Sequence, residues 1–136
     1  MGPTRKRFFF YGTLMDRALL SGVLERRVSA RDLVPARLQG WRRTAVKGET
    51  YPAALRCRGA VSMGLVFTRV RAGDEARLSV YEGPGYRIVA GVAQSGERRR
   101  DVRFFVPRPG AYTPVNRSWA FAAWRRRQRS PRGGSA

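Results

Sequence analysis

Glu82 is the side chain that the sequence places best for acid–base chemistry. The chain has no histidine and a single cysteine, Cys57, which excludes Ser-His-Asp and Cys-His catalysis, so such chemistry falls to a carboxylate, a tyrosine, a lysine or Cys57. Glu82 stands four residues after Leu78 in a predicted helix over Ala72–Glu82, on the side that Leu78 turns inward. Partial burial and the negative end of the helix dipole both raise the pKa of a carboxyl group, which suits a general base near neutral pH.

Two of these residues also have structural interpretations. Glu82 can instead form an ion pair with an arginine such as Arg87, because structural ion pairs are common. Cys57 lies between Arg56 and Arg58, which favours its thiolate, but without a histidine base a buried or incidental cysteine is the preferred interpretation. Without histidine or a second cysteine, the sequence predicts no zinc or iron–sulfur site.

A second candidate is the stretch Phe8-Phe9-Phe10-Tyr11-Gly12-Thr13-Leu14, where an apolar run enters a glycine turn. The aromatic run is typical of a buried strand. Gly12 lets the backbone turn and lets a ligand approach closely. Consecutive backbone N–H groups in such a loop can converge on an anion. A strand that simply ends in a glycine turn is the alternative.

The elements that must position these residues are many short strands and three helices. We expect strands over Arg7–Tyr11, Val28–Leu38, Arg42–Val46, Tyr51–Leu55, Val61–Val70, Tyr86–Ala93 and Arg98–Val106, with turns at Gln39-Gly40-Trp41, Lys47–Thr50 and Arg58-Gly59. We expect helices over Asp16–Gly22 and Ala72–Glu82, and a last one, capped by Asn116 or Ser118, that carries Trp119, Phe121, Ala122 and Trp124. In the strand over Val61–Val70, Val61, Met63, Leu65 and Phe67 share one face and Gly64 allows another backbone to come close. This pattern predicts an α+β fold with a small β-barrel.

The 136 residues suit a single domain over 7–129, between a basic arm over 1–6 and a flexible tail over 130–136. No apolar run approaches 18 residues, so we expect no membrane span. The single cysteine is consistent with a cytoplasmic protein. The oligomeric state is open.

The chain carries 28 basic and nine acidic residues, a formal charge of +19, which favours anionic partners. One alternative function is therefore a non-catalytic basic module that binds nucleic acid or an acidic partner. Its candidate arginines are Arg125, Arg126, Arg127, Arg129 and Arg132. The basic residues are spread along the chain rather than gathered in one recognition helix, which disfavours nucleic acid, and a solvated helix end explains the cluster equally well.

Five blocks together resemble the gamma-glutamylcyclotransferase-like family, which includes gamma-glutamylaminecyclotransferases and their avirulence-induced-gene-like bacterial relatives. In order, they are Phe9-Phe10-Tyr11-Gly12-Thr13-Leu14, Leu38-Gln39-Gly40-Trp41, Tyr51-Pro52-Ala53, Gly64-Leu65-Val66-Phe67, and Tyr81-Glu82-Gly83 followed by Tyr86. The resemblance covers about Arg7 to Val106, and Trp119 fits the closing helix of the family.

The resemblance implies a small mixed β-barrel with flanking helices and a cofactor-free gamma-glutamyl cyclotransferase. Glu82 would be the catalytic acid–base, and the substrate-binding residues would be Tyr11, Gly12, Thr13, Leu14, Tyr51 and Tyr86. Two positions depart from the family: Ser79 replaces a frequent Asp, and Ile88 replaces a usual basic residue, with Arg87 one place early. The substrate would be a gamma-glutamyl amine, peptide or biosynthetic intermediate that releases 5-oxoproline. We expect loops such as Lys47–Thr50 and Pro107–Pro114 to shape the leaving-group side of the pocket.

The basic-module alternative has a direct test. If it holds, the protein binds single-stranded or duplex DNA or RNA with an affinity that falls steeply as salt rises, because phosphate contacts release counterions. The measurement is a binding titration at several salt concentrations. An absence of binding at low salt would exclude this function.

Overall fold

A computed structural model describes residues 6–129. Its strands are β1 (Phe8–Phe10), β2 (Leu33–Ala45), β3 (Pro52–Phe67), β4 (Tyr86–Ser95) and β5 (Arg98–Pro107). Its helices are α1 (Arg17–Leu24), α2 (Asp74–Glu82) and α3 (Phe121–Arg129), with 3-10 turns η1 (Thr13–Met15) and η2 (Ala30–Asp32). The tail over 130–136 and all but Lys6 of the basic arm lie outside the described residues. None of the helices that the structure describes is long and apolar enough to cross a membrane.

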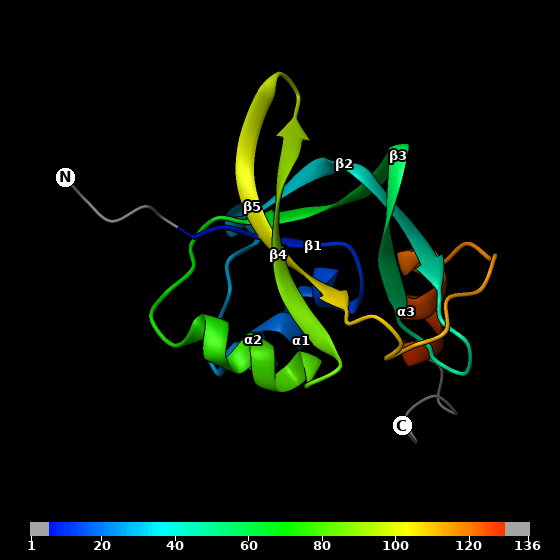
Figure 1. The fold of residues 1–136 in the computed structure, drawn as a ribbon. Coiled ribbons are helices and arrows are strands. Elements are labelled where there is room, and N and C mark those ends of the chain that lie inside the picture. The colour runs from blue at the N-terminus through cyan, green and yellow to red at the C-terminus, as the bar shows by residue number, and fades with distance from the viewer. Residues whose placement is uncertain (1–5, 130–136) are drawn as a thin grey trace.

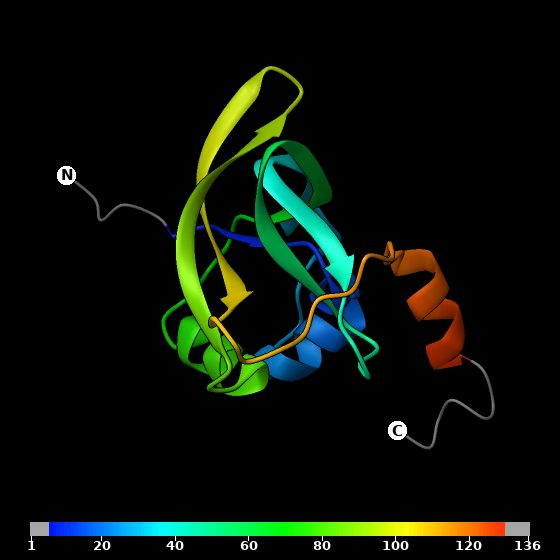
Figure 2. The ribbon, with the colours of Figure 1, turned by 45° about the vertical axis from the view of Figure 1, so that its right-hand side comes forward.

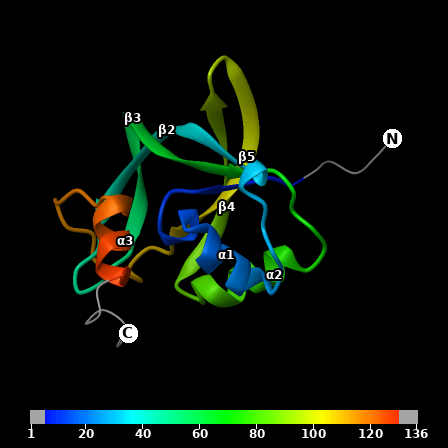
Figure 3. The ribbon, with the colours of Figure 1, turned by 180° about the vertical axis from the view of Figure 1, so that it is seen from behind.

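The strands form a closed barrel in the order β1-β3-β2-β4-β5 (Figure 1). Neighbouring strands are antiparallel except β1 and β5, which pair in parallel at Phe8 and Arg103 and so close the barrel. Helices α1 and α2 lie side by side against the barrel, as the view from behind shows (Figure 3). Helix α3 lies apart from them, beside the loop that connects the end of β2 to the start of β3 (Figure 2). The predicted α+β fold with a small mixed barrel is confirmed.

Both faces of β1 are buried, which explains its uninterrupted aromatic sequence. Phe9 and the following Tyr11 point into the barrel interior, against Leu38, Val66 and Phe104. Phe8 and Phe10 point outward, where they are covered by residues of α1, α2 and β3, namely Leu20, Leu24, Leu78 and Phe67. Hydrophobic burial on two sides thus fixes the strand that leads into the Tyr-Gly-Thr-Leu loop.

Local signals set the ends of the two helices beneath β1. Asp16 caps α1 as predicted, because its Oδ1 accepts a hydrogen bond from the backbone N–H of Leu19 at 3.1 Å. The predicted stop at Gly22 was wrong: the helix continues to Leu24 and ends at Glu25, which adopts φ 55°. Helix α2 ends at Gly83 as predicted, with φ 87° at that glycine.

Two predicted turns are bends inside continuous strands. Strand β2 continues through Gly40 with a register shift between Gln39 and Trp41, and β3 continues through Gly59. Both glycines adopt positive φ, 83° and 84°, which lets a strand bend sharply while its pairing resumes on the other side. The prediction of four strands over this region was therefore wrong, and two long strands curve around the barrel instead.

Three further predictions need correction. The strand expected from Val28 begins at Leu33, after η2. The strand expected over Val61–Val70 ends at Phe67, and on its shared face Val61 and Met63 point away from the barrel, 47% and 55% exposed. The last helix begins at Phe121, so neither Asn116 nor Ser118 caps it and Trp119 precedes it. The end of β2 holds the segment before it: Ala45 N–H donates to the Arg117 carbonyl at 2.9 Å, and Val115 N–H donates to the Ala45 carbonyl at 3.0 Å.

The close approach predicted at Gly64 gives a stability test. A Cβ at Gly64 would lie 2.2 Å from the Phe10 carbonyl oxygen and 2.5 Å from the Phe9 ring. We expect Gly64→Ala to lower the free energy of unfolding by about 2–3 kcal/mol, because β1 and β3 must separate. The measurement is urea unfolding. Gly22→Ala is the control: its Cβ meets nothing within 4 Å in α1, and we expect a gain of about 0.5–1 kcal/mol. Equal stabilities of the two variants would contradict this account.

Candidate active site

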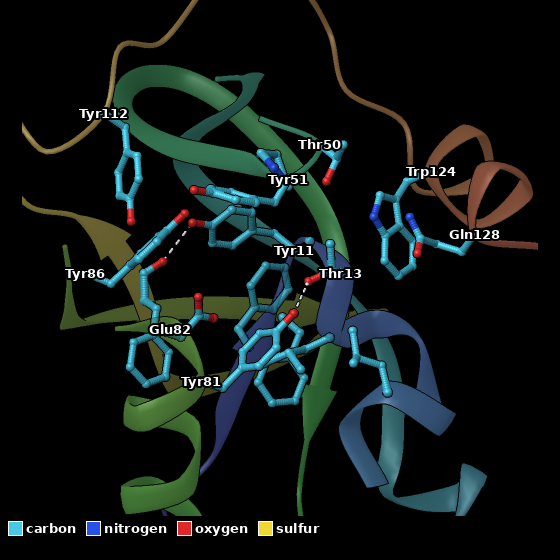
Figure 4. Close-up of a pocket in the computed structure, with 17 residues that line it drawn as sticks. Tyr11, Thr13, Thr50, Tyr51, Tyr81, Glu82, Tyr86, Tyr112, Trp124 and Gln128 are labelled. Carbon is cyan, nitrogen blue, oxygen red and sulfur yellow. Dashed lines mark hydrogen bonds between the residues drawn. The ribbon is translucent and has the colours of Figure 1, made fainter. Parts of the chain in front are cut away.

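A cavity of about 440 Å³ opens where β1 ends. It lies between the loop after β1, the C-terminal end of α2, the start of β3 and helix α3 (Figure 4). Its walls are mostly aromatic and hydroxylic. The lining residues are Phe9, Phe10, Tyr11, Gly12, Thr13, Leu14, Leu19, Thr50, Tyr51, Pro52, Tyr81, Glu82, Tyr86, Phe105, Tyr112, Trp124 and Gln128.

Glu82 presents the carboxylate of this cavity. Glu82 is the last residue of α2, one turn after the fully buried Leu78, and its side chain points toward Tyr11 and Tyr86 (Figure 4). Burial raises the pKa of Glu82 from its ordinary value of 4.5 to about 7. Within residues 6–129 it forms no ion pair, so the alternative of a structural pair with Arg87 is not what the structure has.

Four tyrosines, Tyr11, Tyr51, Tyr86 and Tyr112, line the cavity together with Glu82. The Tyr11 hydroxyl is buried and donates to the carbonyl of Phe105 at 2.8 Å, so it fixes β1 against β5. The rings of Tyr51, Tyr86 and Tyr112 form a cluster with centroid separations of 5.2 to 6.5 Å. Burial first, then nearby negative charge, raises the pKa of Tyr11 and of Tyr86 above the ordinary value. These hydroxyls therefore stay protonated and act as hydrogen-bond donors.

The Tyr-Gly-Thr-Leu loop forms the wall beside Glu82. It folds into η1, in which Met15 N–H donates to the Gly12 carbonyl at 3.1 Å. The first N–H groups of such a turn have no partner inside it, so they are available to a ligand. The hydroxyls of Thr13 and Tyr81 lie 3.1 Å apart and tie the loop to the end of α2. A side chain on Gly12 would press on Pro52 at 3.1 Å, which explains the glycine there.

All seven residues predicted from the sequence, Glu82, Tyr11, Gly12, Thr13, Leu14, Tyr51 and Tyr86, line this one cavity. The sequence analysis missed Tyr112 as an individual residue, although it named the Pro107–Pro114 loop that carries it. It also missed Tyr81, which belongs to the Tyr-Glu-Gly block. Trp124 and Gln128 of α3 carried no sequence signal for the site, because only tertiary packing brings the last helix to the cavity.

Within residues 6–129, no Arg or Lys lines the cavity, although the chain has 28 basic residues. Glu82 is its one ionisable carboxylate. Among the described residues, no group of three histidine, cysteine, aspartate or glutamate side chains could hold a metal ion. What the site offers a ligand is therefore one carboxylate of raised pKa, tyrosine and threonine hydroxyls, and backbone N–H groups.

Comparison with known proteins defines the class. The sequence model of the family described as gamma-glutamyl cyclotransferase, AIG2-like, matches residues 8–126. The chain belongs to this family, as the resemblance of its five blocks indicated.

Three relatives illustrate the similarity. Protein AIG2 C of Arabidopsis thaliana is 31% identical over 87 residues, which make up 64% of this chain and 51% of that protein. The chain thus spans about half the length of this curated relative. The solution structure of an Arabidopsis thaliana protein is 25% identical with a TM-score of 0.71, over 91% of this chain and 74% of the other. A gamma-glutamyl cyclotransferase shares the fold at 13% identity and a TM-score of 0.60, over 80% and 69% of the two chains.

The raised pKa of Glu82 predicts how stability depends on pH. Between pH 4.5 and about 7 the unfolded chain ionises Glu82 while the folded chain keeps it protonated, so native stability falls as pH rises through this window. Glu82→Gln removes this loss. We expect the variant to match the native protein near pH 4.5 and to exceed it at pH 8 by at most about 3 kcal/mol.

Urea unfolding of both proteins at the two pH values is the measurement. Glu97→Gln is the matched control, because Glu97 is exposed in the turn between β4 and β5. A Glu82→Gln advantage that does not change with pH would contradict a raised pKa.

Proposed function

We propose that this protein is a cofactor-independent gamma-glutamyl cyclotransferase with Glu82 as its general acid–base. The observation that supports this most is the position of Glu82. It is a carboxylate with a pKa raised to about 7 and no ion-pair partner among the described residues, facing the Tyr-Gly-Thr-Leu loop across one cavity. Family membership favours the same activity.

The reaction proceeds within the substrate. The glutamyl α-ammonium group gives a proton to the Glu82 carboxylate, and the resulting amine attacks its own γ-carbonyl carbon. A tetrahedral intermediate forms with its negative charge on oxygen. Glu82 then returns its proton to the leaving nitrogen, and the C–N bond breaks. The ring nitrogen, which is still NH2+ after the attack, gives its second proton to the Glu82 carboxylate and from there to the departing amine, so that 5-oxoproline and an ammonium ion result. A group with a pKa near the working pH serves both steps well.

The walls of the cavity hold the glutamyl chain folded for this attack. Backbone N–H groups of Gly12 to Leu14 receive the α-carboxylate or the developing oxyanion. The Tyr86 hydroxyl, which donates to no protein acceptor within the described residues, is a second donor. Holding the two reacting groups together can contribute several kcal/mol, on the order of what intramolecular reactions show.

The cavity suits an amine leaving group better than an amino acid or peptide leaving group. A peptide leaving group ends in a carboxylate, and none of the described residues that line the cavity is an Arg or Lys that could receive it. Tyr112 of the predicted Pro107–Pro114 loop and Tyr51, which directly follows the Lys47–Thr50 loop, present aromatic faces that suit an aliphatic or cationic amine. The substrate we propose is therefore a gamma-glutamyl amine.

The two departures from the family pattern lie outside this cavity. Ser79 is exposed on α2, and Ile88 is half-buried on β4. Both line a second groove with Arg87 and Arg108, which shares Tyr86 and Phe105 with the cavity. Neither Ser79 nor Ile88 itself lines the cavity that Glu82 faces, which favours a retained activity.

The test is release of 5-oxoproline from a panel of gamma-glutamyl amines and dipeptides. We expect release by the native protein, fastest with amines, and a loss of at least about 100-fold in Glu82→Gln, because proton transfer then lacks its carboxylate. Below pH 7 the native kcat/KM should fall as Glu82 becomes protonated.

The control variant is again Glu97→Gln, for which we expect native rates, and circular dichroism checks that each variant is folded. Undiminished release by folded Glu82→Gln would overturn the role of Glu82. An absence of release by the native protein across the panel would count against the activity itself.

A further inference from the structure

Arg43 stands behind the cavity and contacts both of its walls. It lies on β2 between the exposed Arg42 and the buried Thr44, and it is half-buried. Its Nη1 donates to the carbonyl oxygen of Tyr11 at 3.0 Å and to that of Met63 at 3.1 Å. Its guanidinium carbon lies 5.5 Å from the centre of the Trp119 ring. One side chain therefore joins β1, β3 and the segment before α3.

The charge of Arg43 is compensated without an acid. Within residues 6–129 it forms no ion pair, and burial lowers its pKa below the ordinary value. Two backbone carbonyls and the face of one indole ring stabilise the positive charge in place of solvent. A lysine could not reproduce the whole arrangement, because it lacks the planar guanidinium that lies over the Trp119 ring.

The contact with Tyr11 controls the direction of a backbone donor. The Tyr11 carbonyl and the Gly12 N–H belong to one planar trans peptide, so they point in opposite directions. Arg43 does not line the cavity, whereas Gly12 does. A carbonyl held toward Arg43 therefore keeps the Gly12 N–H pointing away from Arg43. Rotation of this peptide would replace the donor with an acceptor and remove it from the loop's set of N–H groups.

The contact with Trp119 reaches the opposite wall. The Trp119 indole N–H donates to the carbonyl of Thr50 at 2.7 Å, and Thr50 lines the cavity next to Tyr51. Stacking on Arg43 fixes the indole plane, and the indole in turn fixes the backbone before β3. The two walls are thus connected through Arg43 and Trp119.

We propose that Arg43 is a positioning residue, which orients the Tyr11–Gly12 peptide for substrate binding and holds the Thr50 wall in register with it. This inference rests on the proposed function for its effect on rate. Its effect on the backbone is independent of that function.

The kinetic test compares Arg43→Gln and Arg43→Lys with Arg42→Gln, the matched control on the exposed neighbouring position. With the best gamma-glutamyl amine, we expect Arg43→Gln to lower kcat/KM by at least about 10-fold, mainly through kcat, since a misplaced donor weakens the transition state most. The pH at which kcat/KM falls should stay unchanged, because Glu82 is untouched. Arg43→Lys should recover only part of the rate, and Arg42→Gln should stay within about twofold of native.

The second readout needs no activity. Amide hydrogen exchange, followed by NMR, should become at least about fivefold faster in Arg43→Gln, but not in Arg42→Gln, at Met15 and Asp16, whose N–H groups donate to the carbonyls of Gly12 and Thr13, and at the Trp119 indole N–H. Native kcat/KM in folded Arg43→Gln, or exchange equal to that of Arg42→Gln, would overturn the inference. An inactive native protein with faster exchange in Arg43→Gln would instead remove the proposed function and keep the positioning role.

A third variant covers the case in which Arg43→Gln does not fold. Trp119→Phe keeps a ring for Arg43 and removes the hydrogen bond to Thr50. We expect faster exchange in the segment around Thr50 and Tyr51 and a kcat/KM reduced by at least about threefold. Native exchange and native kinetics in this variant would overturn the connection between the two walls.

Discussion

The burial of β1 on both faces is the constraint on which the rest of the structure depends. Phe9 and Tyr11 fill the barrel, while Phe8 and Phe10 lie under α1 and α2. Because a single three-residue strand closes the barrel between β3 and β5, its position must be fixed from both sides. The same packing places the strand's end, and hence the Gly12 turn, at the mouth of the barrel. The hydrophobic effect therefore positions the loop before any polar contact does.

The C-terminal end of α2 meets this loop because one hydrophobic cluster holds both. Leu78 packs against Phe8 and Phe10, so Glu82, one turn later, is carried to the cavity. Desolvation there raises the pKa of Glu82, and no cation among the described residues approaches to lower it again. Among the residues that the structure describes, no Arg or Lys lines the cavity, and burial without a nearby cation keeps the pKa of Glu82 raised.

Opposed walls of the cavity come from segments far apart in the sequence. The Tyr11–Leu14 loop, Thr50 and Tyr51, Tyr112 and helix α3 meet there. Contacts behind the wall join them: Tyr11 to Phe105, Arg43 to Tyr11, and Trp119 to Thr50. Such supporting contacts decide how accurately donors face a substrate, since small displacements cost much of the benefit of positioning.

The sequence by itself determined the parts of this protein that depend on local pattern. The aromatic run, the Asp16 cap and Gly83 marked a strand and two helix ends, because side-chain periodicity and backbone preferences act over a few residues. Glu82 could be singled out for the same reason: its position relative to Leu78 and the helix end is a local property. The many short strands predicted a small barrel, and the five ordered blocks added the family.

Only the tertiary structure decided whether a glycine ends a strand or bends it. It also decided which distant residues lie together around the cavity. Gly40 and Gly59 look like turns in sequence, but strand pairing on both sides makes them bends within β2 and β3. Hydrogen bonds with Ala45 likewise hold Val115 and Arg117 against the end of β2, so the helix begins later and the expected caps are unused. Tyr112, Trp124 and Arg43 belong to the site or its support through contacts between distant segments. Such contacts leave no local pattern, because they depend on how the whole chain packs.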